Sequence, residues 1–250
     1  MIVQLFDPAR AAALFDGWPE AIVWSCVQGV MGSILADDPE RPTAAMARLG
    51  DFRFFAGQPD EELVRIPSGG FCILVPRDEA WSACIRRVWS ARARPITRYA
   101  IRKDTVFDPV HLHAAAASLP AGYALREIDE RLFDACRTAA WSRDLVSQFP
   151  DYAAYRRLGL GVAALKGERV VAGASTYARY TGGIEIEIDT AESERRQGLA
   201  YACGAQLILN CLARGLYPSW DAHNPASVAL AEKLGYRLDH PYPAFELGWE

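Results

Sequence analysis

The chain has 250 residues, of which 51% are hydrophobic and 23% are charged, and its formal net charge at pH 7 is -4. This composition is ordinary for a folded globular protein and excludes a disordered chain. The negative charge and the lack of long lysine or arginine runs argue against a nucleic-acid-binding surface, so a cationic amine is the easier partner.

The N-terminal segment and the cysteines indicate the compartment. The first residues lack a basic start followed by a long apolar core, and no apolar run of about eighteen residues occurs, so we expect neither export nor a membrane span. The six cysteines never form a C-x-x-C pair, and several fall inside apolar patterns. We therefore expect reduced core cysteines in a cytoplasmic protein, with no metal site.

The first half of the chain predicts an α/β arrangement. Its apolar periodicity predicts a helix over 8–15, a strand hairpin over 21–27 and 30–36, a strand over 71–75, a helix over 79–89 and a strand over 92–102. Segments 43–49 and 52–56 fit either a strand pair or a helix followed by a strand. The segment 104–120, with two prolines and an alanine-rich turn, is the candidate linker.

The second half predicts strands and helices in alternation. The expected elements are a strand over 123–128, helices over 129–141 and 149–158, a hairpin over 161–166 and 170–177, a strand from 184, a helix from 199, a strand after 217, a helix from 225 and a strand over 242–247. Pro241 and Pro243 favour an edge position for the last strand.

The segment from Ile184 to Gly204 organises this half. Isoleucines alternate with acidic residues up to Asp189, which is typical of a half-buried strand, and helical apolar spacing begins at Leu199. A glycine-bearing turn between them leaves first-turn N–H groups at a positive helix end, where anions and especially phosphates bind. By itself, the hexamer from Arg195 to Ala200 is better explained as an ordinary turn with two solvated arginines.

A second motif follows this segment. Asn224-Pro225 is a helix start with an N-cap acceptor, and Gly235 closes that helix. The succession of a strand, R-x-x-G-x-A, a helix, a strand, N-P-A-S and a helix ending in L-G-Y resembles the GNAT superfamily of acyl-CoA-dependent N-acyltransferases. Within it, residues 189–209 and 216–236 look most like the branch containing the zwittermicin A self-resistance acetyltransferase.

The resemblance implies an α/β (α+β) fold with a mixed, mostly antiparallel central sheet flanked by helices. We expect two domains. Residues 1–118 would form an N-terminal α/β domain that is a degenerate GNAT-like half and shapes the acceptor side of the cleft. Residues 119–250 would form the catalytic domain that binds acetyl-CoA.

The resemblance also implies a place for acetyl-CoA, used as a co-substrate. Backbone N–H groups of the turn would hold the diphosphate, and exposed backbone of the organising strand would pair with the pantetheine arm. The expected cofactor-binding residues are Ile188, Asp189, Arg195, Arg196, Gln197, Gly198, Leu199, Ala200, Asn224 and Ser227. For Asn224 an N-cap role accounts for most of its expected function.

Amine attack on a thioester needs a base. Glu187 and Glu185 lie on one face of the strand and are the candidates, with Glu187 first because it is nearer the expected cleft; simple solvent exposure of each is an equal alternative. The family's usual general-acid tyrosine is replaced here by Ala231. Water, Tyr217 and Tyr236 remain as alternatives, Tyr236 being more typical of a core aromatic.

Other polar residues near the site have structural explanations. Trp220 is expected to be structural, Asp221 fits either a cationic amine or a backbone hydrogen bond, and His223 is expected to lie in a loop. His111 and His113 are too few for a metal site.

These patterns predict an N-acetyltransferase that acts on the amine of a small molecule by direct transfer, as a monomer or a homodimer. The alternative is a catalytically weak protein that binds CoA as a sensor or interaction protein. A nucleotide-binding protein ranks lower, because the turn lacks the lysine and hydroxyl of a nucleoside-triphosphate loop.

Overall fold

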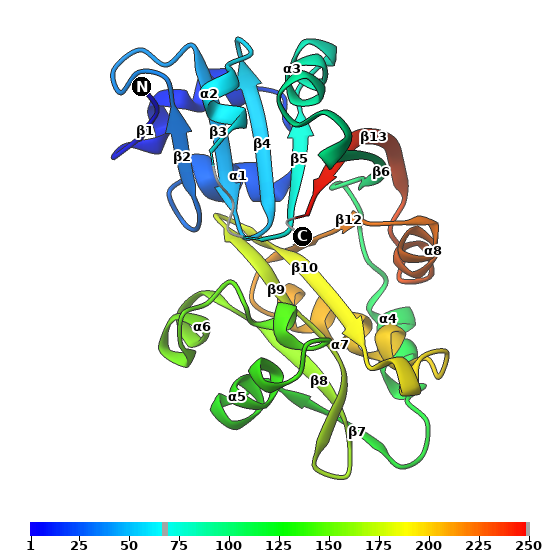
Figure 1. Cartoon of the computed structure of the whole chain (residues 1–250). Helices are drawn as coiled ribbons and strands as arrows, with labels where there is room; N and C mark the ends of the chain where they lie inside the picture. Colours follow the sequence, from blue (N-terminus) through cyan, green and yellow to red (C-terminus); the bar gives the residue numbers. More distant parts are fainter. Residues whose placement is uncertain (67–69, 249–250) are drawn as a thin grey trace. The chain divides into compact units, whose positions relative to one another are not determined.

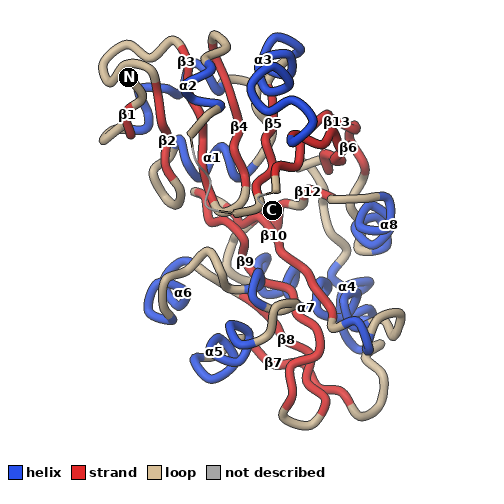
Figure 2. Tube along the Cα trace, viewed as in Figure 1, coloured by secondary structure: helices blue, strands red, loops and turns tan. Residues whose placement is uncertain are grey.

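The computed structural model describes residues 1–66 and 70–248 (Figures 1 and 2). The chain divides into two compact units, one made of Met1–Ala100 with His240–Glu250 and the other of Ile101–Asp239. The expected boundary lay after residue 118. The division instead falls after Ala100 and again before His240. The segment expected to be a linker lies in the second unit, and the last strand returns to the first.

The first unit is built on a mixed sheet. Seven of its strands follow the order β1-β2-β3-β4-β5-β13-β6, with β4 and β5 parallel and β5 antiparallel to β13. They are β1 (Val3–Gln4), β2 (Ser33–Ala36), β3 (Ala44–Leu49), β4 (Phe52–Gly57), β5 (Cys72–Pro76), β6 (Ala93–Ile101) and β13 (Leu238–Leu247). The helical segments are η1 (Pro8–Phe15), α1 (Ala21–Val27), α2 (Glu61–Val64), α3 (Glu79–Trp89) and η2 (Ser90–Arg92).

Two of the expectations for this unit are wrong. Residues 21–27 form the helix α1 rather than a strand of a hairpin, because an apolar run of seven residues has no period that separates a buried strand from a buried helix. The last strand, β13, lies between β5 and β6 rather than at an edge. Its pairing with β5 runs from Phe245 to Leu247, and Pro241 and Pro243 precede this paired segment, so neither proline interrupts it.

The ambiguous segments 43–49 and 52–56 form a strand pair, β3 and β4, with Leu49 opposite Phe52. The core beside them is aromatic. Trp81 of α3 is fully buried and stacks on Phe55 of β4 with ring centroids 5.1 Å apart, and its indole N–H donates to the carbonyl of Gly57 at 2.9 Å. The indole therefore combines a large buried area with a satisfied polar group.

The second unit contains a five-stranded sheet in the order β11-β10-β9-β8-β7. Its strands are β7 (Tyr123–Glu127), β8 (Gly161–Lys166), β9 (Arg169–Tyr180), β10 (Gly183–Thr190) and β11 (Tyr217–Ser219), and the two-residue β12 (Asp221–Ala222) follows. The helical segments are α4 (Pro109–Ala117), α5 (Glu130–Thr138), η3 (Arg143–Leu145), α6 (Tyr152–Leu158), η4 (Glu192–Glu194), α7 (Leu199–Leu212) and α8 (Pro225–Lys233). β7 to β10 are antiparallel, and β11 is parallel to β10.

Cross-strand neighbours show which face of this sheet each helical segment covers. A side chain at Gly204 of α7 would meet Ile188, so the isoleucine face of β10 packs on α7. Gly173, opposite Asp189 in the register, would meet Leu145 of η3 instead. The acidic face of β10 is therefore turned towards η3.

The expected linker is in part a helix. Asp108 caps α4, its carboxylate accepting the N–H of Val110 at 2.9 Å, and Pro109 occupies the first turn. α4 packs against α7. The sequence pattern missed this helix because its alanines form no apolar stripe, although alanine favours a helix.

The fold class is confirmed: helices flank mixed sheets whose pairings are mostly antiparallel. All six cysteines are free and buried, as expected, and burial raises the pKa of the Cys203 thiol to about 12. Over the described residues, every helix is too short or too polar to cross a bilayer.

Candidate active site

The second unit opens where β10 and β11 separate. The two strands pair through three positions, from Gly183 opposite Tyr217 to Glu185 opposite Ser219. β11 then ends, whereas β10 continues beside β9 to Thr190. The edge of β10 beyond Glu185 is therefore not covered by β11.

A cleft of about 1010 Å³ lies at this opening. β10, the turn after it and the first turn of α7 form one wall, and Trp220 and α8 form the other. Of the residues expected to bind the cofactor, the cleft is lined by Ile188, Asp189, Arg195, Arg196, Gly198, Leu199, Ala200 and Ser227.

The turn before α7 has two residues in left-handed backbone conformations. Gly198, the N-cap of α7, has φ of 79°, and Arg196 has φ of 65°. Gly198 carries no side chain, so the N–H groups of the first turn of α7 have no side-chain cap. Gly198, Leu199 and Ala200 line the cleft. Left-handed residues within such a turn direct successive N–H groups towards one point, which is a concave anion site.

The other two expected cofactor residues have different surroundings. Gln197 is bonded to Tyr123 and Glu194 rather than lining the cleft. Asn224 caps α8, its side-chain oxygen accepting the N–H of Ser227 at 3.0 Å. The Ser227 hydroxyl in turn accepts the indole N–H of Trp220 at 3.1 Å, which ties the two sides of this wall together and agrees with a structural role for Trp220.

Three carboxylates follow one another on the acidic face of β10. Glu185 is buried at the last paired position, and Glu187 is half-buried, two residues beyond it. Neither is among the residues that line the cleft, whereas Asp189 is. Burial raises the pKa of Asp189, against the opposing effect of the hydrogen bond from the N–H of Thr190. Sequence reasoning assigned Asp189 to cofactor binding and missed its altered acidity, which depends on burial.

The two tyrosines considered as general acids are held away from the cleft. The Tyr217 hydroxyl accepts the N–H of Thr105 at 3.2 Å and donates to the carbonyl of Arg102 at 3.3 Å. Tyr236 is a core residue, as expected, and donates to the carbonyl of Pro218 at 2.6 Å. Burial raises the pKa of both, which makes them weaker proton donors.

Sequence reasoning missed one residue that lines the cleft and one that contacts the lining from α4. Tyr201 lines it from the first turn of α7, and its hydroxyl lies 3.3 Å from Nε2 of His111 in α4. The same Nε2 lies 2.7 Å from the carbonyl of Lys233, at the end of α8. His111 therefore links the helices on the two sides of the cleft, a role that no local pattern signals.

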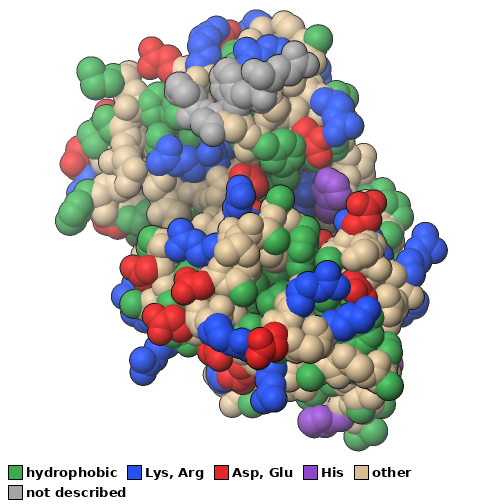
Figure 3. Space-filling model, turned by 60° about the horizontal axis from the view of Figure 1, so that its bottom comes forward, with side chains coloured by type: hydrophobic (Ala, Val, Ile, Leu, Met, Phe, Trp, Pro, Cys, Tyr) green, Lys and Arg blue, Asp and Glu red, His purple; other side chains and the backbone are tan. Residues whose placement is uncertain are grey.

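Two further observations concern the surface charge and the possible metal ligands. On the face drawn in Figure 3, basic and acidic side chains of the described residues are interspersed, unlike the concentrated basic surface that nucleic acids need. Residues 1–66 and 70–248 contain no group of three or more side chains arranged to hold a metal ion.

A parallel strand pair that opens onto a glycine-capped helix is the arrangement that the GNAT resemblance implied, so the fold and site are those of the GNAT class. Comparison with known proteins agrees, since the family model described as GNAT acetyltransferase matches residues 12–245. The chain belongs to the GNAT acetyltransferase family.

Individual relatives also support membership of this family. A GCN5-related N-acetyltransferase-like protein from Streptococcus suis 89/1591, known from a crystal structure, is 48% identical to this chain in sequence. Its structure superposes with a TM-score of 0.93, and 98% of each chain is covered. The uncharacterized N-acetyltransferase YdfB of Bacillus subtilis (strain 168) is 33% identical over 132 residues, which are 52% of this chain and 50% of that protein. The chain thus matches about half the length of this curated relative.

A tandem GNAT protein from the clavulanic acid biosynthesis pathway is similar in fold alone. It is 12% identical, with a TM-score of 0.60 and with 99% of this chain and 98% of that chain covered. An arrangement of two GNAT-like halves is therefore compatible with this fold.

Proposed function

We propose that this protein is an N-acetyltransferase that moves the acetyl group of acetyl-CoA to the amine of a small molecule by direct transfer in a ternary complex. The observation that supports it is the opening between β10 and β11. An edge of strand can hydrogen-bond the peptide-like pantetheine arm, and the adjoining N-terminus of α7 can take the diphosphate.

The residues of the cleft suit this ligand. The N–H groups from Arg196 to Ala200 would hold the diphosphate, and the backbone of Ile188 and Asp189 would bind the arm. A β10 N–H near the thioester would stabilise negative charge that develops on the carbonyl oxygen. Bound acetyl-CoA supplies the activated acyl group, and the remaining task of the chain is to orient the amine and remove its proton.

Glu187 is our first choice for the base that takes this proton, directly or through water, and Glu185 is the second. Glu187 follows the point where the strands part, whereas Glu185 is buried at the last paired position. A dedicated general acid is not essential, because a thiol with a pKa of about 8.5 is a tolerable leaving group.

The acceptor is proposed to be a small amine. The net charge of -4 favours a cationic partner. The sequence resemblance to the branch containing the zwittermicin A self-resistance acetyltransferase supports an aminated natural product as its class, although a fold hosts many substrates.

The test is thiol release from acetyl-CoA with a panel of small amines, together with detection of the acetylated amine by mass spectrometry. Amine-dependent release with formation of product supports the proposal. If calorimetry shows no binding of CoA, the proposal is wrong.

The second candidate is a CoA-binding sensor with little turnover. It is favoured by the buried Ala231 in place of a general-acid tyrosine and by the positions of Tyr217 and Tyr236 outside the cleft. Tight binding of CoA with no thiol release across the panel would support the sensor over the enzyme.

A further inference from the structure

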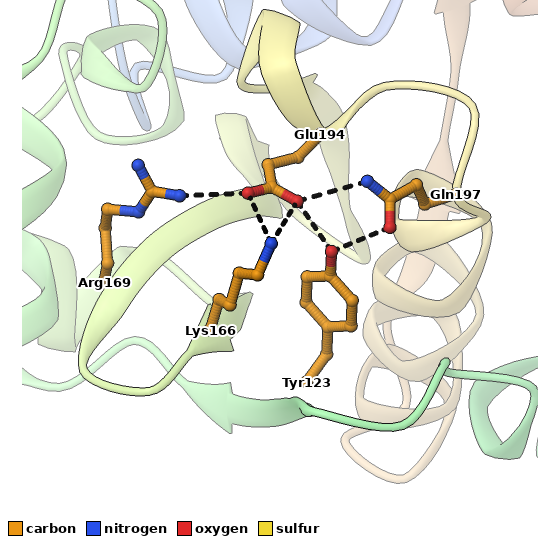
Figure 4. A network of polar contacts seen from close by, with 5 residues as sticks. All are labelled: Tyr123, Lys166, Arg169, Glu194 and Gln197. Carbon is orange, nitrogen blue, oxygen red and sulfur yellow. Dashed lines mark hydrogen bonds and ion pairs between the residues drawn. The ribbon is translucent and has the colours of Figure 1, made fainter.

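The turn that lines the cleft begins at a buried carboxylate. Glu194, the last residue of η4, has a side chain that is 5% exposed. Figure 4 shows four side chains directed at it: Tyr123, Lys166, Arg169 and Gln197. We call these five residues the Glu194 network.

The contacts of this network are within hydrogen-bonding distance. Glu194 accepts the Tyr123 hydroxyl at 2.6 Å, the Lys166 ammonium at 3.1 Å and the Arg169 guanidinium at 2.9 Å. The Gln197 amide donates to the same carboxylate at 3.2 Å, and its oxygen lies 2.7 Å from the Tyr123 hydroxyl. The hydrogen bonds and positive charges lower the pKa of Glu194, so the carboxylate is ionised at neutral pH.

The partners come from separate parts of the unit. Tyr123 begins β7, Lys166 ends β8 and Arg169 begins β9, so three strands of the sheet meet at Glu194. Gln197 belongs to the turn itself. Because Glu194 and Gln197 are both bonded into the network, the turn is attached to the sheet on both sides of Arg196.

Arg196 is the residue that needs this support. Its backbone φ is 65°, a conformation that residues other than glycine rarely adopt. Its N–H is among those expected to hold the diphosphate. Such a conformation persists when the residues around it are fixed. The Glu194 network supplies fixed neighbours two residues before Arg196 and one residue after it.

The charges of the network suit an anion nearby. A lone carboxylate at the cleft would repel a diphosphate, but Lys166 and Arg169 pair with Glu194, which leaves one net positive charge. The carboxylate can therefore organise the turn without making the site negative.

We infer that Glu194 is a positioning residue, which holds the 195–198 turn in the conformation that presents its N–H groups to the diphosphate of CoA. This inference rests on the proposed function, because it assigns CoA to the cleft. The residue acts through the turn and is not assigned a contact with the acetyl group.

The direction in which one substitution changes the affinity for CoA tests the inference. Glu194→Gln removes a negative charge, so a purely electrostatic role predicts tighter binding of CoA. A positioning role predicts weaker binding, about tenfold by calorimetry, because a glutamine amide faces Lys166 and Arg169 and releases the turn. Glu192→Gln makes the same change on the exposed part of η4 and should alter the dissociation constant by less than about twofold.

Two further measurements keep the test decisive if Glu194→Gln folds poorly. Tyr123→Phe removes only the hydroxyl that contacts both Glu194 and Gln197, and it should weaken CoA binding by about threefold. In the absence of ligand, amide hydrogen exchange of Tyr123→Phe, and of Glu194→Gln where it folds, should be faster at residues 195–200 and unchanged in β9.

The outcomes separate the two proposals. Unchanged or tighter CoA binding in both variants, with wild-type exchange in the turn, would overturn the positioning role while leaving the proposed function intact. Faster exchange in the turn of the variants, together with a wild-type protein that binds no CoA, would support Glu194 as the residue that holds the turn and refute the assignment of CoA to the cleft.

Discussion

At the residue scale, Gly198 shows how one backbone conformation can shape a binding site. Its φ of 79° is costly for any residue with a side chain, yet a Cβ placed there would meet no atom of the protein within 4 Å. The glycine is therefore required by backbone conformation and by access to the first-turn N–H groups, not by crowding within the protein.

Gly198→Ala should reduce stability and ligand binding together. We expect a loss of about 1 kcal/mol in the free energy of unfolding from the left-handed conformation, and CoA binding about tenfold weaker because the methyl group lies over the N–H groups. Denaturant unfolding and calorimetry measure the two effects.

Gly215→Ala is the matched control. Gly215 has φ of 66°, a Cβ placed on it would also meet no atom within 4 Å, and it lies beyond the other end of α7. The Gly215→Ala variant should lose about as much free energy of unfolding as Gly198→Ala, and its affinity for CoA should be unchanged. Equal affinity losses in the two variants would contradict an anion site at Gly198.

Single substitutions can also identify the base. If Glu187 removes the proton of the amine, Glu187→Gln should lower kcat by about 100-fold or more and abolish the rise of the rate with pH. Glu185→Gln is the comparison, measured at a temperature where both variants are folded. A larger loss of kcat in Glu185→Gln would reverse our ranking of the two carboxylates.

At the scale of elements, α7 is held close to β10 by Gly204. A Cβ on Gly204 would lie 2.9 Å from a methyl group of Leu234 and 3.2 Å from one of Ile188. Glycine within a helix costs about 1 kcal/mol relative to alanine. The close approach explains its presence, because it lets a cleft-lining strand residue pack directly on the helix.

Gly204→Leu should therefore separate α7 from β10. We expect a loss of about 1–3 kcal/mol in the free energy of unfolding from overpacking, and weaker CoA binding because Ile188 lines the cleft. Ala213→Leu places the same side chain at the exposed end of α7 and should change stability by less than about 0.5 kcal/mol. Equal stability of the two variants in urea would contradict this account of the packing.

The attachment of η4 to the sheet should depend on pH. The network lowers the pKa of Glu194, so its contribution to stability is complete above the unfolded value of about 4.3 and is lost as the pH falls through the lower folded value. The difference in Tm between wild type and Glu194→Gln should be constant from about pH 7 to 5 and shrink below about pH 4.3. A difference that grows on acidification would be inconsistent with an ionised, paired carboxylate.

At the scale of the whole molecule, the described residues that line the cleft all belong to the unit Ile101–Asp239. The core around Trp81 belongs to the other unit. Binding of CoA and stability of the first unit should therefore be separable.

Trp81→Ala tests this separation. Truncating a fully buried tryptophan should cost about 3–5 kcal/mol in the free energy of unfolding, while the folded variant keeps its CoA affinity. Guanidinium unfolding and calorimetry at low temperature provide the measurements. A folded Trp81→Ala protein that no longer binds CoA would show that the first unit contributes to the cofactor site.

Local patterns predicted the second unit well from Tyr123 onward, although they missed α4. The helix boundaries at Asn224 and at the turn before Leu199, the hairpin about 167–168 and the alternation of β10 depend on neighbours in sequence, and all are present. In the first unit, 21–27 has no distinguishing period, so its helix depended on packing that the pattern could not show.

The sequence by itself determined the acidic and apolar faces of β10, the glycine turn and the capped helix that follows it, because each arises from periodicity or from backbone preferences of adjacent residues. Only the tertiary structure decided that β11 ends where β10 continues, that β13 enters the middle of a sheet, and that Tyr123, Lys166 and Arg169 meet Glu194. These features join residues far apart in the chain, and their energies come from burial and charge pairing that form when the sheet assembles.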